Sequence, residues 1–120
     1  MQGLLLSDDL IFTSRIVGTA RDLGLEIGAA RTLGDLQRRL DVVAPVCVIL
    51  DLHHPDLKTF DAIPLLKARG LRVVGYGSHV AADVLHAARQ AGCDVVWPRS
   101  KFVEELATAM PGWLNAREAK

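Results

Sequence analysis

Acidic side chains follow two apolar runs in this sequence. Asp51 comes directly after the run at 46–50, and Asp8 and Asp9 follow the leucines at 4–6 after a single serine. If these runs form neighbouring parallel strands, the three carboxylates lie at the same edge of one sheet. Carboxylates held close together repel one another, and their oxygens are the ligands that hard cations prefer. The pattern therefore predicts a divalent-cation site formed by Asp8, Asp9 and Asp51.

A purely structural interpretation of the same acids is also open. Aspartate is among the most favoured residues at the N-cap of a helix, where its carboxylate accepts a hydrogen bond from a backbone amide. Either Asp8 or Asp9 would fill that position if a helix begins next, and Asp51 would then simply mark the end of a strand.

The bulk composition is that of an ordinary globular domain. The chain has 120 residues, 50% of them hydrophobic, and a formal net charge of zero. One core fits that length, and the lack of a net positive charge argues against binding to nucleic acid or to an anionic membrane. No apolar run approaches the length of a membrane span. We expect one cytoplasmic domain over residues 1–120, without an output domain.

Short apolar runs alternate with segments of helical periodicity along the chain. The expected strands lie at 3–6, 26–30, 46–50, 72–75 and 95–97, and the expected helices at 11–23, 34–40, 60–68, 81–91 and 102–114. Such alternation is typical of α/β proteins whose parallel sheet is covered by helices on both faces. We predict a doubly wound (βα)5 sheet with the flavodoxin-like strand order 2-1-3-4-5. The strands that carry the acids then flank the point where strand order reverses and ligands bind.

Glycine, serine and proline mark the expected helix ends. Glycine most easily adopts the left-handed conformation at a helix C-terminus, and three glycines follow helical patterns: Gly24, Gly70 and Gly92. Ser78 and Ser100 precede the last two helical patterns as N-cap candidates. Pro111 is expected to bend or end the final helix.

Three short motifs at these positions are similar to those of a known family. Ser-Asp-Asp at 7–9 follows the first strand, Asp51 is followed four residues later by Pro55, and Ala-Gly at 91–92 precedes the last strand. With these motifs spread over nearly its whole length, the chain resembles the receiver domains of two-component response regulators. The resemblance implies the fold predicted above.

The same resemblance implies a phosphorelay function. Asp51 would accept a phosphoryl group from a histidine kinase or a phosphotransfer protein, while Asp8 and Asp9 help to hold magnesium. A carboxylate can act as a nucleophile toward phosphorus, and magnesium offsets the charge that gathers in the transition state. We therefore expect a signalling component that acts on a downstream protein partner, and not a turnover enzyme.

The residues expected to grip the phosphoryl group depart from the family pattern. Receiver domains end the fourth strand with threonine or serine, whereas Gly77 stands here, with Ser78 one residue further on. They end the fifth strand with lysine and proline, where this chain has Arg99 and, two residues beyond, Lys101. Arginine keeps the charge of lysine but changes its reach and geometry. The phosphoryl-binding candidates are Ser78, Gly77, Arg99 and Lys101, and the alternative function is a pseudo-receiver that docks a protein partner without phosphorylation.

Two weaker interpretations concern cofactors. His53, His54 and Asp56 could form a small transition-metal site, and Asp51-Leu52-His53 is similar to the start of a cobalamin-binding motif. The cobalamin pattern requires a glycine where Asp56 stands, and adjacent histidines in a polar loop are more often simply exposed. A small-molecule or cofactor-binding domain of the same fold is therefore the less favoured alternative.

The surface formed by the fourth helix, the fifth strand and the fifth helix is expected to change with the signalling state, as the resemblance implies. Val96 occupies the strand position where receiver domains often carry a switching aromatic residue. Near the C-terminus, Met110 and Trp113 either pack against the sheet or form a contact face for a homodimer.

Overall fold

Five parallel strands form the centre of the molecule. The computed structural model describes residues 1–115, and its strands are β1 (Gly3–Leu6), β2 (Ile27–Ala30), β3 (Cys47–Asp51), β4 (Arg72–Gly77) and β5 (Val95–Pro98). They pair in the order β2-β1-β3-β4-β5, and each pairing is parallel. The predicted sheet and its strand order are confirmed.

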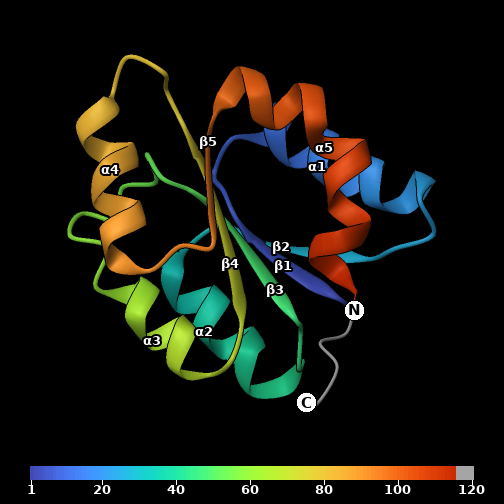
Figure 1. The fold of residues 1–120 in the computed structure, drawn as a ribbon. Helices are drawn as coiled ribbons and strands as arrows, with labels where there is room; N and C mark the ends of the chain where they lie inside the picture. The colour runs from blue at the N-terminus through green and yellow to red at the C-terminus, as the bar shows by residue number, and fades with distance from the viewer. Residues whose placement is uncertain (116–120) are drawn as a thin grey trace.

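Helices cover both faces of this sheet. They are α1 (Leu10–Asp22), α2 (Leu33–Val42), α3 (Ala62–Ala68), α4 (Ala82–Ala91) and α5 (Arg99–Leu114). Figure 1 shows α1 and α5 on one face and α2, α3 and α4 on the other. Parallel strands need such crossovers, because each connection must return to the same end of the sheet. Within the described residues, no helix is both long and apolar enough to cross a membrane.

Side chains of β3 alternate between two separate cores. Cys47 and Ile49 belong to the core under α1 and α5, whereas Val48 and Leu50 belong to the core under α2, α3 and α4. The strand is buried along its whole length, which explains its unbroken apolar run. The same alternation directs the Asp51 side chain to the face covered by α1 and α5.

The N-terminus of α1 is capped by one of the acids of the sequence motif. The Asp9 carboxylate accepts a hydrogen bond from the Phe12 amide at 3.0 Å, so the structural interpretation is confirmed for this residue. The helix-ending glycines are also confirmed. Gly24, Gly70 and Gly92 have φ angles of 74°, 79° and 114°, in the left-handed region.

The last two helices begin differently from the prediction. α4 begins after Ala81 and α5 after Pro98, and no side chain caps either helix. Ser100 lies inside the first turn of α5, and Ser78 opens a turn in which its hydroxyl accepts a hydrogen bond from the Val80 amide at 3.3 Å. The expected serine caps are therefore wrong. For α5 the reason is that the helix starts at residue 99, before its apolar pattern becomes visible.

The final helix continues through Pro111 to Leu114 and does not end at the proline. Two contacts hold its last turn. Met110 and Trp113 are buried in the core under α1 and α5, and the Arg72 guanidinium donates hydrogen bonds to two carbonyls of this turn. Met110 and Trp113 therefore pack against the sheet, and their burial leaves neither as an exposed dimer face.

Replacing Asp9 by alanine tests the cap of α1. We expect Asp9→Ala to lower the free energy of unfolding by about 1 kcal/mol, because one N-terminal amide of the helix loses its partner. Asp8→Ala, at the exposed neighbouring position, is the matched control and should change that free energy by less than about 0.5 kcal/mol. Urea unfolding measures both variants, and equal losses would contradict the assignment of the cap to Asp9.

Candidate functional site

The carboxyl ends of β1 and β3 bring the predicted acids to one edge of the sheet. β1 pairs directly with β3, so Asp8 and Asp9 follow a strand end that lies next to Asp51. We call these three residues the acid edge. The Asp51 side chain is buried, with 5% of the residue exposed, whereas Asp8 and Asp9 are exposed. Asp51 Oδ1 accepts a hydrogen bond from the His53 amide at 3.0 Å, which orients the carboxylate.

The carboxylates of the acid edge are suitable ligands for a hard cation, although they are not grouped closely enough to form a metal site. All three candidate ligands are carboxylates, the group that magnesium and calcium prefer. Asp9 uses Oδ1 to cap α1, and within residues 1–115 no three His, Cys, Asp or Glu side chains are grouped so that they could hold a metal ion. The structure thus brings the acids to one edge without arranging them as a closed set of ligands.

Gly77 ends β4 directly beside the His53 ring. A Cβ atom at this position would lie 3.1 Å from His53 Nε2 and 3.1 Å from Leu85 Cδ2, both tighter than ordinary contact. The ring is held there because Nε2 accepts a hydrogen bond from the Ser78 amide at 2.8 Å. The imidazole therefore occupies the region into which a threonine or serine side chain at position 77 would extend.

The two candidate cations, Arg99 and Lys101, lie against aromatic rings. The guanidinium carbon of Arg99 is 5.6 Å from the centroid of the Phe12 ring, and Lys101 Nζ is 4.9 Å from that of Trp97. Such cation–π contacts contribute about 0.5–1 kcal/mol at exposed sites. The ion pairs of residues 1–115 do not include one between Asp51 and either cation.

These rings belong to a continuous aromatic cluster between the sheet, α1 and α5. Neighbouring ring centroids are between 4.6 and 5.8 Å apart, which is the range of favourable aromatic pairs. In order of contact, the aromatic cluster consists of Phe12, Tyr76, Phe102, Trp113 and Trp97. Arg99 lies on the first ring and Lys101 on the last, so the two cations are held at opposite ends of the cluster.

Tyr76 brings to the acid edge a hydroxyl that sequence reasoning missed. The residue is fully buried, and within the described part of the chain its hydroxyl is the buried side-chain polar atom that has no hydrogen-bond partner. Burial above all, and then the nearby Asp51 carboxylate, raise the pKa of Tyr76 well above its ordinary value. The hydroxyl is therefore protonated at neutral pH. Tyr76 is the strand partner of Asp51. A predicted fourth strand that reached residue 77 would have shown this pairing from the sequence.

His54 and Asp56 organise the loop after β3. The Nδ1 atom of the buried His54 ring accepts a hydrogen bond from the Asp56 amide at 3.0 Å, so Nε2 carries the proton and donates to the Arg31 carbonyl at 2.7 Å. The Asp56 carboxylate accepts from the Leu33 amide at 2.9 Å, at the start of α2. Both nitrogens of the His54 ring are thus used in hydrogen bonds within the fold. Among residues 1–115, no group of three His, Cys, Asp or Glu side chains could hold a metal ion, so the structure does not support a transition-metal site in this loop.

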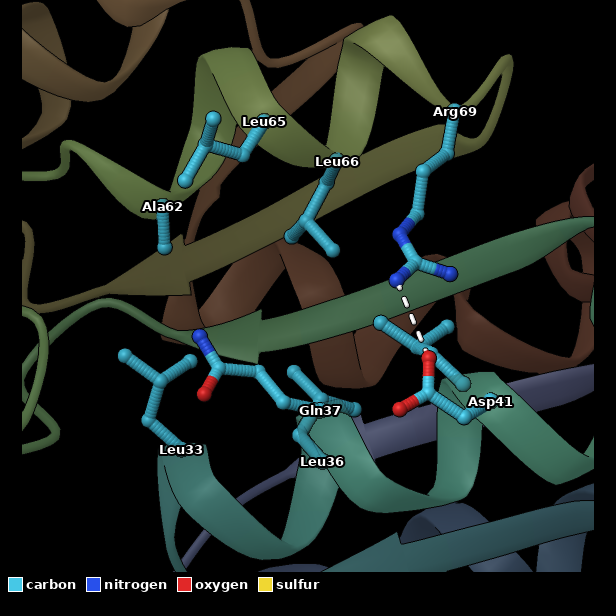
Figure 2. A pocket seen from close by; sticks show the side chains of 9 residues that line it. Leu33, Leu36, Gln37, Asp41, Ala62, Leu65, Leu66 and Arg69 are labelled. Carbon is cyan, nitrogen blue, oxygen red and sulfur yellow. Dashed lines mark hydrogen bonds and ion pairs between the residues drawn. The ribbon is translucent and has the colours of Figure 1, made fainter.

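Two of the hollows among the described residues lie on the face covered by α2, α3 and α4. The first, of about 340 Å³, lies between α2 and α3 and is lined mainly by leucines. Figure 2 shows Arg69 and Asp41 closing one end of it through an ion pair of 3.3 Å. The second, of about 510 Å³, lies between the His53 loop and α4 and is widely open to solvent. Small-molecule sites combine enclosure with convergent polar groups, a combination that neither of these two hollows has.

Comparison with known proteins identifies the fold. No protein-family model and no curated protein matches the chain. The receiver domain of NtrX from Brucella abortus superposes with a TM-score of 0.83 at 18% identity, over 97% of this chain and 100% of that one. A response-regulator receiver domain from Bermanella marisrubri superposes with a TM-score of 0.82 at 20% identity, over 95% of this chain and 98% of that one. An orphan response regulator of H. pylori superposes with a TM-score of 0.79 at 14% identity, over 96% of this chain and 97% of that one. The predicted resemblance to receiver domains is confirmed at the level of the fold.

The loop role of His54 can be tested by truncating its side chain. We expect His54→Ala to lower the free energy of unfolding by about 2–4 kcal/mol, because a buried ring and two hydrogen bonds are lost. His86→Ala, exposed on α4, is the control and should cost less than about 0.5 kcal/mol. Chemical unfolding followed by tryptophan fluorescence measures both, and a loss as small as the control's would show that His54 does not organise the loop.

The crowding of Gly77 by His53 predicts a coupling between the two positions. Gly77→Ala should destabilise the fold by about 1 kcal/mol, because the new methyl group meets two side chains at short distance. In a His53→Ala background this cost should fall, since one of the two close contacts is gone. A double-mutant cycle in urea measures the coupling. Strictly additive effects would mean that the His53 ring does not fill this region.

Proposed function

We propose that this chain is a receiver-like signalling domain that accepts a phosphoryl group on Asp51. The observation that carries the proposal is the position of this carboxylate, which is buried at the carboxyl end of the central strand β3 and adjacent to the acids that follow β1. Ligands of doubly wound sheets bind at this edge, where strand order reverses. The fold shared with solved receiver domains supports the same assignment.

Phosphoryl transfer to Asp51 would exchange one bond to phosphorus for another. A carboxylate oxygen attacks the phosphorus of a phosphohistidine on a kinase or a phosphotransfer protein. A P–O bond forms while the P–N bond breaks, and the departing imidazole nitrogen takes up a proton. Oδ2 is the attacking atom in this proposal, because Oδ1 is engaged by the His53 amide. That amide also keeps the carboxylate in one orientation, so that less orientational entropy is lost on reaction.

Magnesium is the cofactor that we propose for the acid edge, with Asp8, Asp9 and Asp51 as its ligands. When bound, the ion offsets the negative charge that gathers during phosphoryl transfer. Asp9 keeps one oxygen on the N-terminus of α1, which leaves its second oxygen for the ion. Asp8 is exposed and Asp51 buried, so the proposed site joins a solvent-facing ligand to an internal one.

The phosphoryl-binding candidates differ in the contacts that they make within the fold. Arg99 lies on Phe12, whose ring stacks on Tyr76, the strand partner of Asp51. Lys101 lies on Trp97 at the other end of the aromatic cluster. We therefore assign the main cationic role to Arg99 and a secondary one to Lys101. Ser78 would contribute its hydroxyl, and Gly77 only its backbone.

The proposed signalling context follows the family that the fold resembles. A histidine kinase or a phosphotransfer protein would supply the phosphoryl group, and a protein effector would read the surface of α4, β5 and α5. Val96 is buried in β5, so the switching aromatic residue common in receiver domains has no equivalent at this position. We propose that residues 1–120 form a single domain that acts in the cytoplasm.

A second candidate function is a docking module that works without phosphorylation. The observation in its favour is the His53 ring beside Gly77, which fills the region where receiver domains carry a phosphoryl-binding hydroxyl. In that case Asp51 would serve to orient the loop after β3 through the His53 amide. The partner would then bind equally well whether or not residue 51 can be phosphorylated.

Phosphorylation of the purified protein by acetyl phosphate tests the main proposal. With magnesium present, intact-mass spectrometry should show the addition of one phosphoryl group, and chelation of the metal should abolish it. Asp51→Asn should remove the modification completely, because an amide is a poor nucleophile toward phosphorus. Asp22→Asn, at an exposed position of α1, is the matched control and should be modified like the wild type.

Two outcomes would contradict phosphoacceptor activity. One is an unmodified wild-type protein under conditions that modify an ordinary receiver domain. The other is equal modification of Asp51→Asn and the wild type, which would place the phosphoryl group elsewhere. Either outcome would favour the docking module.

A further inference from the structure

The Tyr76 hydroxyl is costly to the fold as it stands. Taking a hydroxyl out of water without giving it a hydrogen-bond partner costs folding free energy, and buried polar groups in proteins are nearly always paired. Tyr76 has no exposed surface, and its hydroxyl has no partner among the described residues. Phenylalanine could pack in the same place without this cost. The hydroxyl therefore indicates a partner that joins only when the site is in use.

Strand pairing places the Tyr76 side chain beside that of Asp51, on the face of the sheet covered by α1 and α5. Tyr76 and Asp51 are partners across β4 and β3, and the charges of Asp51, Arg99 and Asp9 all act on the phenol. The Ser7 hydroxyl is close enough to the phenol to lower the pKa of Tyr76. It is bonded to the backbone of Asp9, however, and within the described residues no contact to Tyr76 has the geometry of a hydrogen bond. An unpaired donor and a buried carboxylate thus share the same small region.

The aromatic cluster fixes the direction of this donor. The Tyr76 ring is stacked on Phe12, with centroids 4.8 Å apart and planes 19° apart, and it lies 4.6 Å from the Phe102 ring. A ring held on both sides cannot turn away without disrupting the core. A donor held in place before its ligand arrives loses little entropy on binding.

We propose that Tyr76 is a phosphoryl-binding residue, whose hydroxyl donates a hydrogen bond to an oxygen of the group carried by Asp51. This inference rests on the proposed function of Asp51 and adds a ligand from the face of β4 covered by α1 and α5. It supplies the hydroxyl that Gly77 lacks on the opposite face of the same strand. Being neutral, it complements the positive charge of Arg99 without competing for the same position.

Beryllium fluoride with magnesium, a phosphoryl mimic that binds to aspartate, is the probe for this role. We expect Tyr76→Phe to bind it about tenfold more weakly than the wild type, because a hydrogen bond to a charged group is lost while the ring packing is kept. Titration followed by the NMR shifts of amides around Asp51 measures both affinities. Tyr76 is the single tyrosine of the chain, so a carbon-13 label at its Cζ gives one signal, which should shift as the wild type saturates.

The stability of Tyr76→Phe in the absence of beryllium fluoride distinguishes a ligand-binding role of Tyr76 from a purely structural one. Tyr76→Phe should raise the melting temperature by a few degrees, because the unpaired buried hydroxyl is gone. A tyrosine kept for packing would instead lose stability and binding together. Opposite changes of stability and affinity are therefore the expected signature of a hydroxyl retained for its ligand.

The outcomes distinguish this inference from the function on which it rests. Equal affinities of the wild type and Tyr76→Phe, or an unmoved Cζ signal at saturation, would overturn the role of Tyr76 and leave Asp51 as the acceptor. A lower melting temperature of Tyr76→Phe would also overturn it. If neither protein responds to the probe, the proposed function of Asp51 fails and the role of Tyr76 fails with it.

Discussion

A carboxylate buried at the end of a central strand is the constraint on which this edge of the protein depends. Removing an ionised carboxylate from water costs several kcal/mol unless donors or cations compensate for the lost hydration. In residues 1–115, the hydrogen bond that the Asp51 carboxylate accepts comes from the His53 amide, while the other polar groups nearby have different partners or none. Such an incompletely compensated charge gains from a ligand that brings its own positive charge or hydrogen-bond donors. This is the physical reason for regarding the acid edge as a binding site.

The aromatic cluster determines what else can reach this carboxylate. It occupies the space between the sheet, α1 and α5, and it holds Arg99 and Lys101 at its two ends through cation–π contacts. It also holds the Tyr76 ring, so a polar group enters the acid edge from inside the core. On the other face of β4, the His53 ring takes the room beside Gly77. The polar groups that we propose for this site therefore lie on both faces of one strand and differ from those of the receiver pattern.

The fold was predictable because each strand and helix carries its own periodic signal, and β3 has an apolar run that suits burial on both faces. The placement of the acids followed from topology alone. Tyr76 was missed because the expected fourth strand ended at residue 75, two residues before the observed end of β4. The start of α5 was placed late because Arg99 and Lys101 interrupt the apolar pattern, although both are helical. The His53 position depends on a hydrogen bond to Ser78, across 25 residues of sequence, for which no local pattern exists.

A crystal structure of the wild-type protein grown with magnesium and beryllium fluoride tests the central claim most directly, because it shows the ligands of Asp51 atom by atom. The account predicts beryllium fluoride bonded to Asp51, magnesium on the carboxylates of the acid edge, and the Tyr76 hydroxyl within hydrogen-bond distance of a fluorine atom, with the aromatic cluster unchanged. A structure in which Asp51 carries no ligand while both reagents are present in excess would contradict it.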